Sequence, residues 1–217
     1  MRTKFFAAAF AAVAAAGPLF GDDALPKSIF NETPERRAER ISWWRHDRFG
    51  MFIHFGIYSK LAGWWKGEKI PFYGEQIMNH ARITTEEYEA VAREFNPKDF
   101  NADEIVLLAK QAGMKYIVMT SKHHDGFCMF HTETTDYNIV DFTPFGRDVV
   151  KELSDACKRH GIKFGLYYSL PDWHYPLGIP RLAPDPTTKC HEYVNQVYSP
   201  LEIVTPELED YIVAQVT

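Results

Sequence analysis

Residues 113–121 read GMKYIVMTS, and residues 161–169 read GIKFGLYYS. Both segments contain a glycine, an apolar residue, a lysine, an aromatic residue, an apolar run and a closing serine, and they begin 48 residues apart. Short apolar runs of this kind are typical of strands that are buried on both faces of a parallel sheet. The repeat therefore predicts two parallel strands, and it decides the fold.

We expect an amphipathic helix before each of these strands. The first is predicted over residues 102–112, behind an Asn101 cap, and the second over residues 148–160. Their buried faces are predicted to consist of Ile105, Leu108, Ala109 and Ala112 in the first helix and of Val149, Leu153, Ala156 and Cys157 in the second. Gly113 and Gly161 stand where a chain leaves a helix in the left-handed conformation. The repeated unit is therefore helix, glycine, buried strand and long loop.

Three further elements complete the predicted order. FGMFIHFG at 49–56 reads as a first strand, TTEEYEAVAREF at 84–95 as a helix, and TPELEDYIVAQV at 205–216 as a last helix. Repeated αβ units with apolar strands predict an α/β fold with a parallel sheet covered by helices. We interpret the chain as the N-terminal part of a (β/α)₈-like (TIM) barrel with about three βα units. The barrel is expected to be incomplete here, because a whole one takes ~250 residues.

The N-terminus has the layout of a secretory signal peptide. A short positive start, MRTK, precedes the apolar run FFAAAFAAVAAAGPLF and then two aspartates. We therefore expect a signal peptide at 1–21, a lead-in at 22–40 and a partial barrel domain at 41–217. The protein is expected to be exported, to the periplasm or the medium, and not to be held in a membrane after cleavage.

Composition favours a globular protein that does not bind nucleic acid. Hydrophobic residues make up 46% of the chain and aromatic residues 15%, which is enough for a sizeable core. The formal net charge is −5, and it becomes −7 once Arg2 and Lys4 are removed with the signal peptide. A chain this acidic lacks the basic surface that phosphate backbones require. Its three cysteines, Cys128, Cys157 and Cys190, form no paired framework, and Cys157 is expected to be a buried thiol.

Polar and aromatic side chains cluster just where the predicted strands end. His54 follows the first strand, His123 and His124 follow the second, and Tyr167 and Tyr168 come late in the third. In α/β folds, functional sites collect at the carboxyl ends of the strands, so we expect the site there. The proline-rich loop that follows, roughly 170–204, is longer than a plain connection needs and is interpreted as a functional lid or an ordered excursion.

The motif SKHHDGF at 121–127 admits three interpretations. His123, His124 and Asp125 are metal-ligand types, with His54 a further donor, but neighbouring residues of an extended chain point to opposite sides and no standard metal spacing occurs. The motif can also be a plain turn, since Asp-Gly is a common turn pair. A glycan site is the third interpretation, because neutral imidazole both donates and accepts hydrogen bonds. Its candidate carboxylates are Glu75, Asp125 and Asp172, and its candidate aromatic walls are Phe55, Trp64, Trp65, Phe127 and Trp173.

Several motifs together resemble one enzyme family. They are WWRHDRFGMFIHFGIYS, GEQIM, KYIVMTSKHHDGFCMF, RDVV and IKFGLYYSLPDW, in this order between about residues 40 and 175. They are similar to the N-terminal half of the catalytic domain of the α-L-fucosidases, glycoside hydrolase family 29. The resemblance implies a retaining exo-glycosidase on a (β/α)₈-like barrel, with a fucosylated oligosaccharide or glycoconjugate as its partner and with no metal or other cofactor.

The resemblance also implies roles for five residues. His54 is similar to the family's sugar-binding histidine after the first strand, and His123 and His124 to the pair that holds the fucose hydroxyls. Tyr167 is similar to the tyrosine near the reacting centre, and Glu75 in GEQIM to the acidic residue that contacts the sugar. Where the family often has tryptophan after that glutamate, this chain has a glutamine at position 76. Under the same resemblance, Asp125 is expected to be a structural turn residue and Asp172 a loop residue.

No catalytic residue is expected within these 217 residues. In the family the nucleophile is an aspartate at the end of the fourth strand and the acid/base lies further on, so both are expected beyond Thr217. We therefore expect this chain alone to be inactive and to leave an open sheet edge. Two alternatives stay open: a non-catalytic fucose-binding remnant, which keeps the histidines and aromatics without turnover, and a metal-dependent hydrolase.

Overall fold

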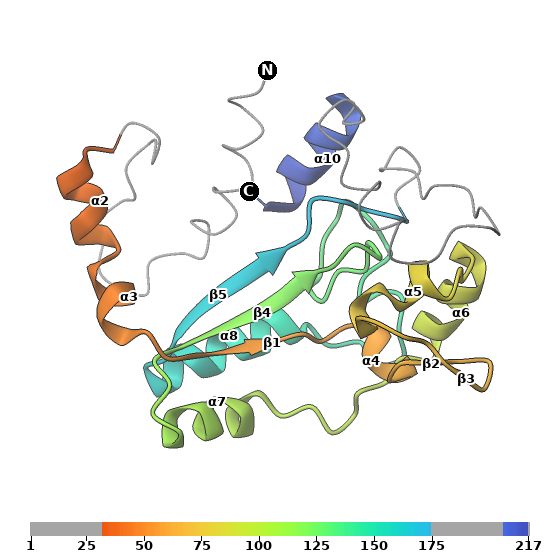
Figure 1. Cartoon of the computed structure of the whole chain (residues 1–217), viewed down its shortest axis with the longest axis horizontal. Coiled ribbons are helices and arrows are strands. Elements are labelled where there is room, and N and C mark those ends of the chain that lie inside the picture. The colour runs from red at the N-terminus through yellow and green to blue at the C-terminus, as the bar shows by residue number, and fades with distance from the viewer. Residues whose placement is uncertain (1–31, 175–205, 217) are drawn as a thin grey trace.

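A three-stranded parallel sheet forms the centre of the protein (Figure 1). The computed structural model describes residues 32–174 and 206–216. The sheet consists of β1 (Gly50–Ile53), β4 (Tyr116–Lys122) and β5 (Lys163–Tyr168), in the order β1-β4-β5. Both strand pairs are parallel, and the two strands of the repeat are neighbours. The predicted α/β class and parallel sheet are thereby confirmed, while closure into a (β/α)₈ barrel stays a prediction.

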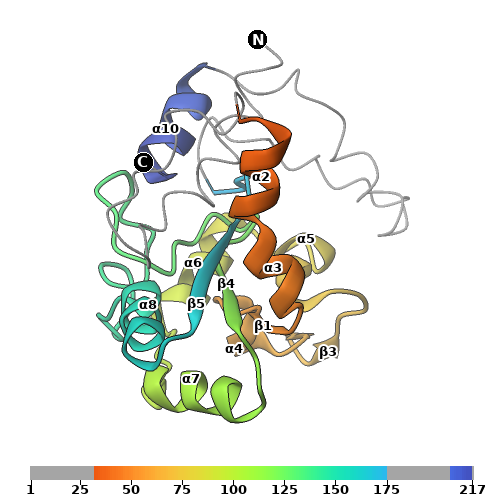
Figure 2. The ribbon, with the colours of Figure 1, turned by 90° about the vertical axis from the view of Figure 1, so that its left-hand side faces the viewer.

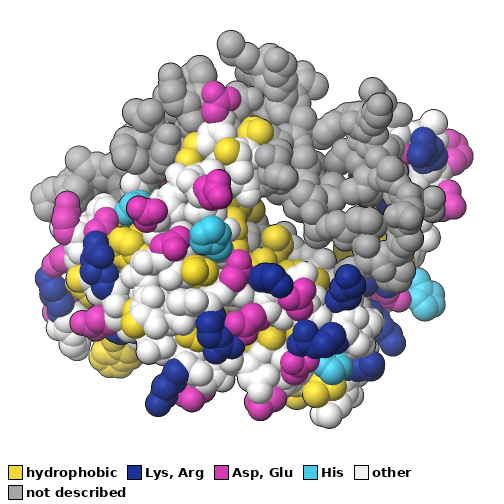
Figure 3. Space-filling model, turned by 180° about the vertical axis from the view of Figure 1, so that it is seen from behind, with side chains coloured by type: hydrophobic (Ala, Val, Ile, Leu, Met, Phe, Trp, Pro, Cys, Tyr) yellow, Lys and Arg dark blue, Asp and Glu magenta, His cyan; other side chains and the backbone are white. Residues whose placement is uncertain are grey.

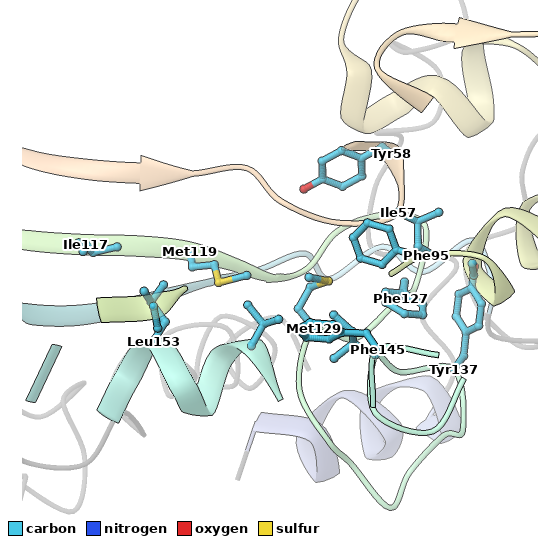
Figure 4. Close-up of a cluster of buried hydrophobic side chains, with 14 of the residues drawn as sticks. Ile57, Tyr58, Phe95, Ile117, Met119, Phe127, Met129, Tyr137, Phe145 and Leu153 are labelled. Carbon is cyan, nitrogen blue, oxygen red and sulfur yellow. The ribbon is translucent and has the colours of Figure 1, made fainter. Parts of the chain in front are cut away.

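Two helices cover one face of this sheet. α7 (Ala102–Gln111) and α8 (Val149–His160) lie side by side beneath the strands in Figures 1 and 2. Ile117 and Met119 of β4 are fully buried and lie over Leu153 of α8 in the core (Figure 4). Alternate residues of a strand point to opposite faces, so these apolar side chains leave the other face of the sheet for the residues between them.

Local signals fix where these helices begin and end. The side chain of Asn101 accepts a hydrogen bond from the backbone N–H of Glu104 (3.2 Å) at the start of α7, and Asp148 caps α8. Gly113 and Gly161 have φ angles of +81° and +70°, which is the left-handed conformation predicted for both. The helix of each repeated unit is therefore followed by a glycine in the left-handed conformation, which ends the helix.

The predicted buried face of α7 is right only in part. Ala109 is fully buried as predicted and Ile105 packs partly buried against the core, but Leu108 is 60% exposed, and Val106 and Ala102 are buried instead. Residues 105–109 are all apolar, so the pattern leaves more than half of the helix circumference available for burial. The buried side chains of α7 are small or β-branched and join the core beside α8. For α8, by contrast, Val149, Leu153, Ala156 and Cys157 are fully buried as predicted.

The connection between β1 and β4 carries several short elements. They are α4 (Tyr58–Leu61), β2 (Trp64–Trp65), β3 (Glu68–Lys69), the 3₁₀ helix η2 (Gly74–Gln76), α5 (Ile77–His80) and α6 (Thr85–Arg93). Strands β2 and β3 form a small antiparallel hairpin. The predicted helix at 84–95 corresponds to α6, and it begins with a reciprocal capping box between Thr84 and Glu87.

The remaining helices lie at the two ends of the described chain. α2 (Pro34–Arg40) and α3 (Ser42–Asp47) precede β1, and α10 (Pro206–Val216) lies near the end of β5 (Figure 1). Within the described residues, none of the helices is long and apolar enough to cross a membrane. The predicted signal peptide, the loop beyond residue 174, Cys190 and the helix cap at Thr205 lie outside the described residues.

Surface charge is mixed rather than segregated. Acidic and basic side chains alternate over the face shown in Figure 3, and many are paired, as Arg147 is with Glu152 and Lys151 with Asp155. That face therefore offers no continuous basic strip for a phosphate backbone, in agreement with the acidic composition.

Candidate functional site

Three of the five predicted site residues meet at the carboxyl edge of the sheet. The ring centroids of His54 and His123 are 5.6 Å apart, those of His123 and Tyr167 are 5.8 Å apart, and those of His54 and Tyr167 are 6.3 Å apart. One ring comes from the end of each strand, so the parallel register brings together side chains that are up to 113 positions apart in sequence. We call these three rings the ring cluster.

Glu75 joins the ring cluster from outside the sheet. It lies on η2, after the β2–β3 hairpin, and is partly buried. One carboxylate oxygen of Glu75 and one ring nitrogen each of His54 and His123 lie within 4.8 Å of one another. The spacing is short enough for these three groups to bind the same small polar ligand, or to hold a metal ion.

His124 lies next to the ring cluster but faces another part of the chain. Its ring centroid is 4.5 Å from that of His123, yet its Nδ1 hydrogen-bonds the hydroxyl of Ser169 and its ring packs on Trp173 at 5.2 Å. Adjacent residues diverge at the end of a strand, as the sequence predicts. Of the two histidines, His123 therefore faces His54 and Tyr167, whereas His124 faces the segment after β5.

A buried nitrogen of His123 has no hydrogen-bond partner in the described part of the chain. His123 is only 5% exposed, and its Nδ1 makes no hydrogen bond to any residue that the structure describes. Buried polar atoms are nearly always satisfied by protein, water or ligand, because leaving one unpaired costs free energy. This nitrogen of His123 can therefore still form a hydrogen bond to a water molecule or a ligand.

Burial keeps both motif histidines neutral. It lowers the pKa of His123 to about 3, and the neighbouring His124, His54 and Lys122 lower it further. Burial, with the charge of Lys122, also lowers the pKa of His124 to about 4. At neutral pH each ring therefore offers one N–H donor and one acceptor nitrogen, which is the pairing that a hydroxyl group requires.

Lys122 is a buried charge that the sequence reasoning missed. Its side chain is fully buried, its Nζ donates to Oδ2 of Asp172 (3.1 Å), and it lies 4.7 Å from the ring centroid of Tyr168. Asp172 lies in a loop, as expected, but it is only 1% exposed and forms half of a buried ion pair, which the sequence did not predict. A lysine that follows the apolar run YIVMT was the available signal, since lysine is almost never buried unless it is paired.

Asp125 and Gly126 form the turn behind the histidines. The Asp125 carboxyl is buried and accepts hydrogen bonds from the Tyr88 hydroxyl (3.0 Å) and the Phe127 N–H (3.2 Å). Burial raises its pKa to about 7. The structural role expected for Asp125 is confirmed. Gly126 has a φ of +80°, and a Cβ at this position would overlap Oδ1 of Asp172.

The candidate aromatic walls are mostly elsewhere. Phe127 is buried in the core, Phe55 packs against it, and the ring of Trp173 is buried against His124. Trp64 is exposed and Trp65 partly buried, both on the β2–β3 hairpin.

A different aromatic side chain, Phe52, borders the ring cluster. It is 53% exposed, and its ring centroid is 5.0 Å from that of His54 and 6.0 Å from that of Tyr167. Its position two residues before His54, on the same face of β1, was the signal for it.

The chain spans only part of the length of its curated relatives. It is 39% identical to the human plasma α-L-fucosidase and 35% identical to the bovine tissue α-L-fucosidase, each over 145 residues. These alignments cover 63% of this chain but only 31% and 30% of the two relatives.

Solved structures of α-L-fucosidases are also similar to this chain over part of their length. The α-L-fucosidase AlfC of Lactobacillus casei, solved in complex with α-L-fucose as product, superimposes with a TM-score of 0.63 at 49% identity, over 64% of this chain and 43% of that one. Isoenzyme 1 of Paenibacillus thiaminolyticus gives 0.67 at 38% identity, over 83% and 39%. The family model described as alpha-L-fucosidase matches residues 25–213. With so much of its length matched, this chain belongs to the α-L-fucosidase family.

Proposed function

We propose that the chain provides the fucose-binding part of an exo-acting, retaining α-L-fucosidase, which removes terminal α-L-fucose from oligosaccharides or glycoconjugates. The observation that carries this proposal is the convergence of polar atoms of His54, Glu75 and His123 within 4.8 Å of one another at the carboxyl edge of the sheet. Imidazole and carboxylate groups together can donate hydrogen bonds to the hydroxyl groups of a sugar and accept hydrogen bonds from them. Membership of the family supports the identity of the sugar.

The geometry supports distinct roles for the residues of the site. Neutral His123 donates to one fucose hydroxyl and accepts from another, His54 hydrogen-bonds a further hydroxyl, and the Glu75 carboxylate accepts from hydroxyls that the rings leave unpaired. Tyr167 forms the third corner of the ring cluster and is assigned to the reacting end, and Phe52 offers an apolar face for the C–H side of the sugar.

His124 has an indirect place in this scheme. Its ring touches that of His123 while its Nδ1 is occupied by Ser169. His124 therefore holds the ring of His123 in its orientation, in addition to any contact that His124 itself makes with the sugar.

The two catalytic carboxyl groups are proposed to come from the remainder of the protein. Retaining hydrolysis uses two carboxyl groups ~5–5.5 Å apart, one as nucleophile and one as acid/base. Among the described residues, Glu75 is the carboxylate beside the ring cluster, while Asp125 and Asp172 are buried and occupied by Tyr88 and Lys122. The nucleophile is accordingly proposed beyond Thr217, and the 217-residue chain is expected to have no turnover.

Export is part of the same proposal. The charged start, apolar run and small residues of 1–21 support a cleaved signal peptide and a periplasmic or secreted enzyme. A location outside the cytosol suits an enzyme that acts on glycoconjugates.

The test compares this chain with a version extended through the downstream reading frame. Both are assayed for hydrolysis of 4-nitrophenyl α-L-fucoside and, by calorimetry, for binding of L-fucose. We expect turnover in the extended protein only, and loss of fucose binding in its His54→Ala and Glu75→Gln variants. Fucose binding without turnover in the extended protein would favour a binding remnant. Turnover by the 217-residue chain would contradict the proposed place of the nucleophile.

A metal-dependent hydrolase is the second candidate, because the donors of His54, Glu75 and His123 are close enough to share an ion. Chelation separates it from the first. A fucosidase of the proposed kind keeps its activity after dialysis against EDTA, whereas a metal enzyme loses it and recovers with added Zn²⁺.

A further inference from the structure

We propose that Lys122 and Asp172 are positioning residues, whose buried ion pair fixes the segment after β5 against His124 and so orients the ring cluster toward the sugar. This inference rests on the proposed function, in which His123 contacts fucose. Neither residue lies in the ring cluster itself. Their effect on the sugar is therefore indirect.

The pair is costly unless both members are present. Lys122 and Asp172 have side-chain exposures of 0% and 1%. Taking two charges out of water costs several kcal/mol per ion, and a buried pair of this kind often adds no net stability over apolar residues of the same shape. Stability alone is thus a weak reason for placing a lysine here.

The ion pair anchors a strap that we define as residues 169–174. At its start, the Ser169 N–H donates to the backbone oxygen of Lys122 (3.0 Å). Towards its end, Asp172 accepts from the Lys122 ammonium (3.1 Å) and from the His174 N–H (3.0 Å). Lys122 also donates to the backbone oxygen of Pro171 (3.4 Å). One lysine therefore holds the strap at three points.

The strap in turn holds His124 on its backbone and on its ring. The Trp173 N–H donates to the backbone oxygen of His124 (2.8 Å), the Trp173 ring packs on the imidazole, and the Ser169 hydroxyl hydrogen-bonds Nδ1. These contacts fix the position and the tilt of the ring, and they tie its tautomer to the hydrogen bond with Ser169. Because the ring of His123 packs edge-on against that of His124 at 4.5 Å, the orientation is passed on to the ring cluster.

The variant that tests this removes both charges while keeping the shapes. Lys122→Met combined with Asp172→Asn leaves no unpaired buried charge, and the asparagine can still accept from the His174 N–H. A matched control is Leu153→Ala in α8, which leaves a cavity in the core and removes neither charge of the ion pair. Both are made in the full-length protein and compared in melting temperature, L-fucose affinity and kcat/KM.

We expect the double variant to fold and to lose about 10- to 100-fold in fucose affinity and kcat/KM, since small misplacements of binding groups cost this much. Leu153→Ala should lower the melting temperature at least as far and leave the affinity of the folded protein unchanged. Wild-type affinity in the double variant would overturn the proposal. So would an equal loss of affinity in Leu153→Ala, because the effect would then follow stability.

A spectroscopic measurement separates this inference from the proposed function. The ¹⁵N resonances of the His124 ring report its tautomer and its hydrogen bond to Ser169, whether or not fucose binds. A changed pattern in the double variant supports positioning even if the wild-type protein fails to bind fucose, a failure that would refute only the proposed function. An unchanged pattern overturns the positioning role.

Discussion

Gly126 packs against Asp172, and Gly113, which has the same backbone conformation and open space around it, serves as its control. Gly126 and Gly113 have nearly equal φ angles, +80° and +81°. A Cβ added at Gly113 meets nothing within 4 Å, whereas one added at Gly126 overlaps Oδ1 of Asp172 and comes within 2.8 Å of Cβ of His174. Substituting alanine at each position therefore imposes the same backbone strain, but only Gly126→Ala disturbs the buried ion pair.

The expected magnitudes follow from these contacts. An L-residue in the left-handed region costs ~1–2 kcal/mol, so Gly113→Ala should destabilise by about that amount. Gly126→Ala adds the displacement of Asp172 from Lys122, and breaking a buried pair costs ~3–5 kcal/mol. Because the carboxylate moves rather than disappears, the extra loss is expected at roughly 2 kcal/mol or more, below the upper end of that range.

Urea denaturation followed by tryptophan fluorescence measures both variants against wild type. Gly126→Ala should also weaken L-fucose binding, since the strap shifts with Asp172, whereas Gly113→Ala lies at the opposite end of β4 and should leave it unchanged. Equal losses of stability in the two variants would refute the reasoning, because they would show that Asp172 yields to the new methyl group without cost.

Three further predictions follow from the structure. Burial raises the pKa of Asp125 to about 7, so between pH 5 and 6.5 the folded protein holds a proton that the unfolded chain has released. Relative to Asp125→Asn, the free energy of unfolding of the wild type should therefore fall by ~1.4 kcal/mol for each unit by which the pH rises. A constant difference between the two proteins in urea titrations would show that Asp125 is ionised. Val106→Ala should destabilise by about 2 kcal/mol, and Leu108→Ala by less than about 0.5, in thermal unfolding; the reverse order would restore the face expected from the sequence. His123→Ala should weaken L-fucose binding at least ~10-fold by calorimetry, and wild-type affinity would remove it from the site.

Much of the fold was predictable because its signals are local. The repeat at 113–121 and 161–169 predicts two adjacent parallel strands, and caps and glycines predict where their helices start and stop. The meeting of His54, His123 and Tyr167 was predictable for a topological reason. All three follow strands that run in the same direction, so they must emerge at one edge.

The failures concern features that depend on contacts between distant segments. The face that α7 buries is decided by its packing beside α8, and five consecutive apolar residues at 105–109 permit more than one buried face. The partner of Lys122 lies 50 positions away, in a stretch with no secondary structure to fix its register. Phe52 had a local signal in its position two residues before His54, but its contact with Tyr167 depends on the pairing of distant strands.

The order of residues in SKHHDG has a physical reason that links these observations. Lys122 is buried in the same part of the protein in which burial keeps His123 and His124 neutral. An unpaired ammonium group there would cost a large free energy of desolvation. Lys122 therefore requires a carboxylate, which Asp172 supplies from the strap. Asp172 can approach only where the turn has no side chain, and the left-handed turn after Asp125 places Gly126 at that point. Neutral imidazoles, a buried ion pair and a glycine turn are thus linked features of the end of one strand, where we propose that the sugar binds.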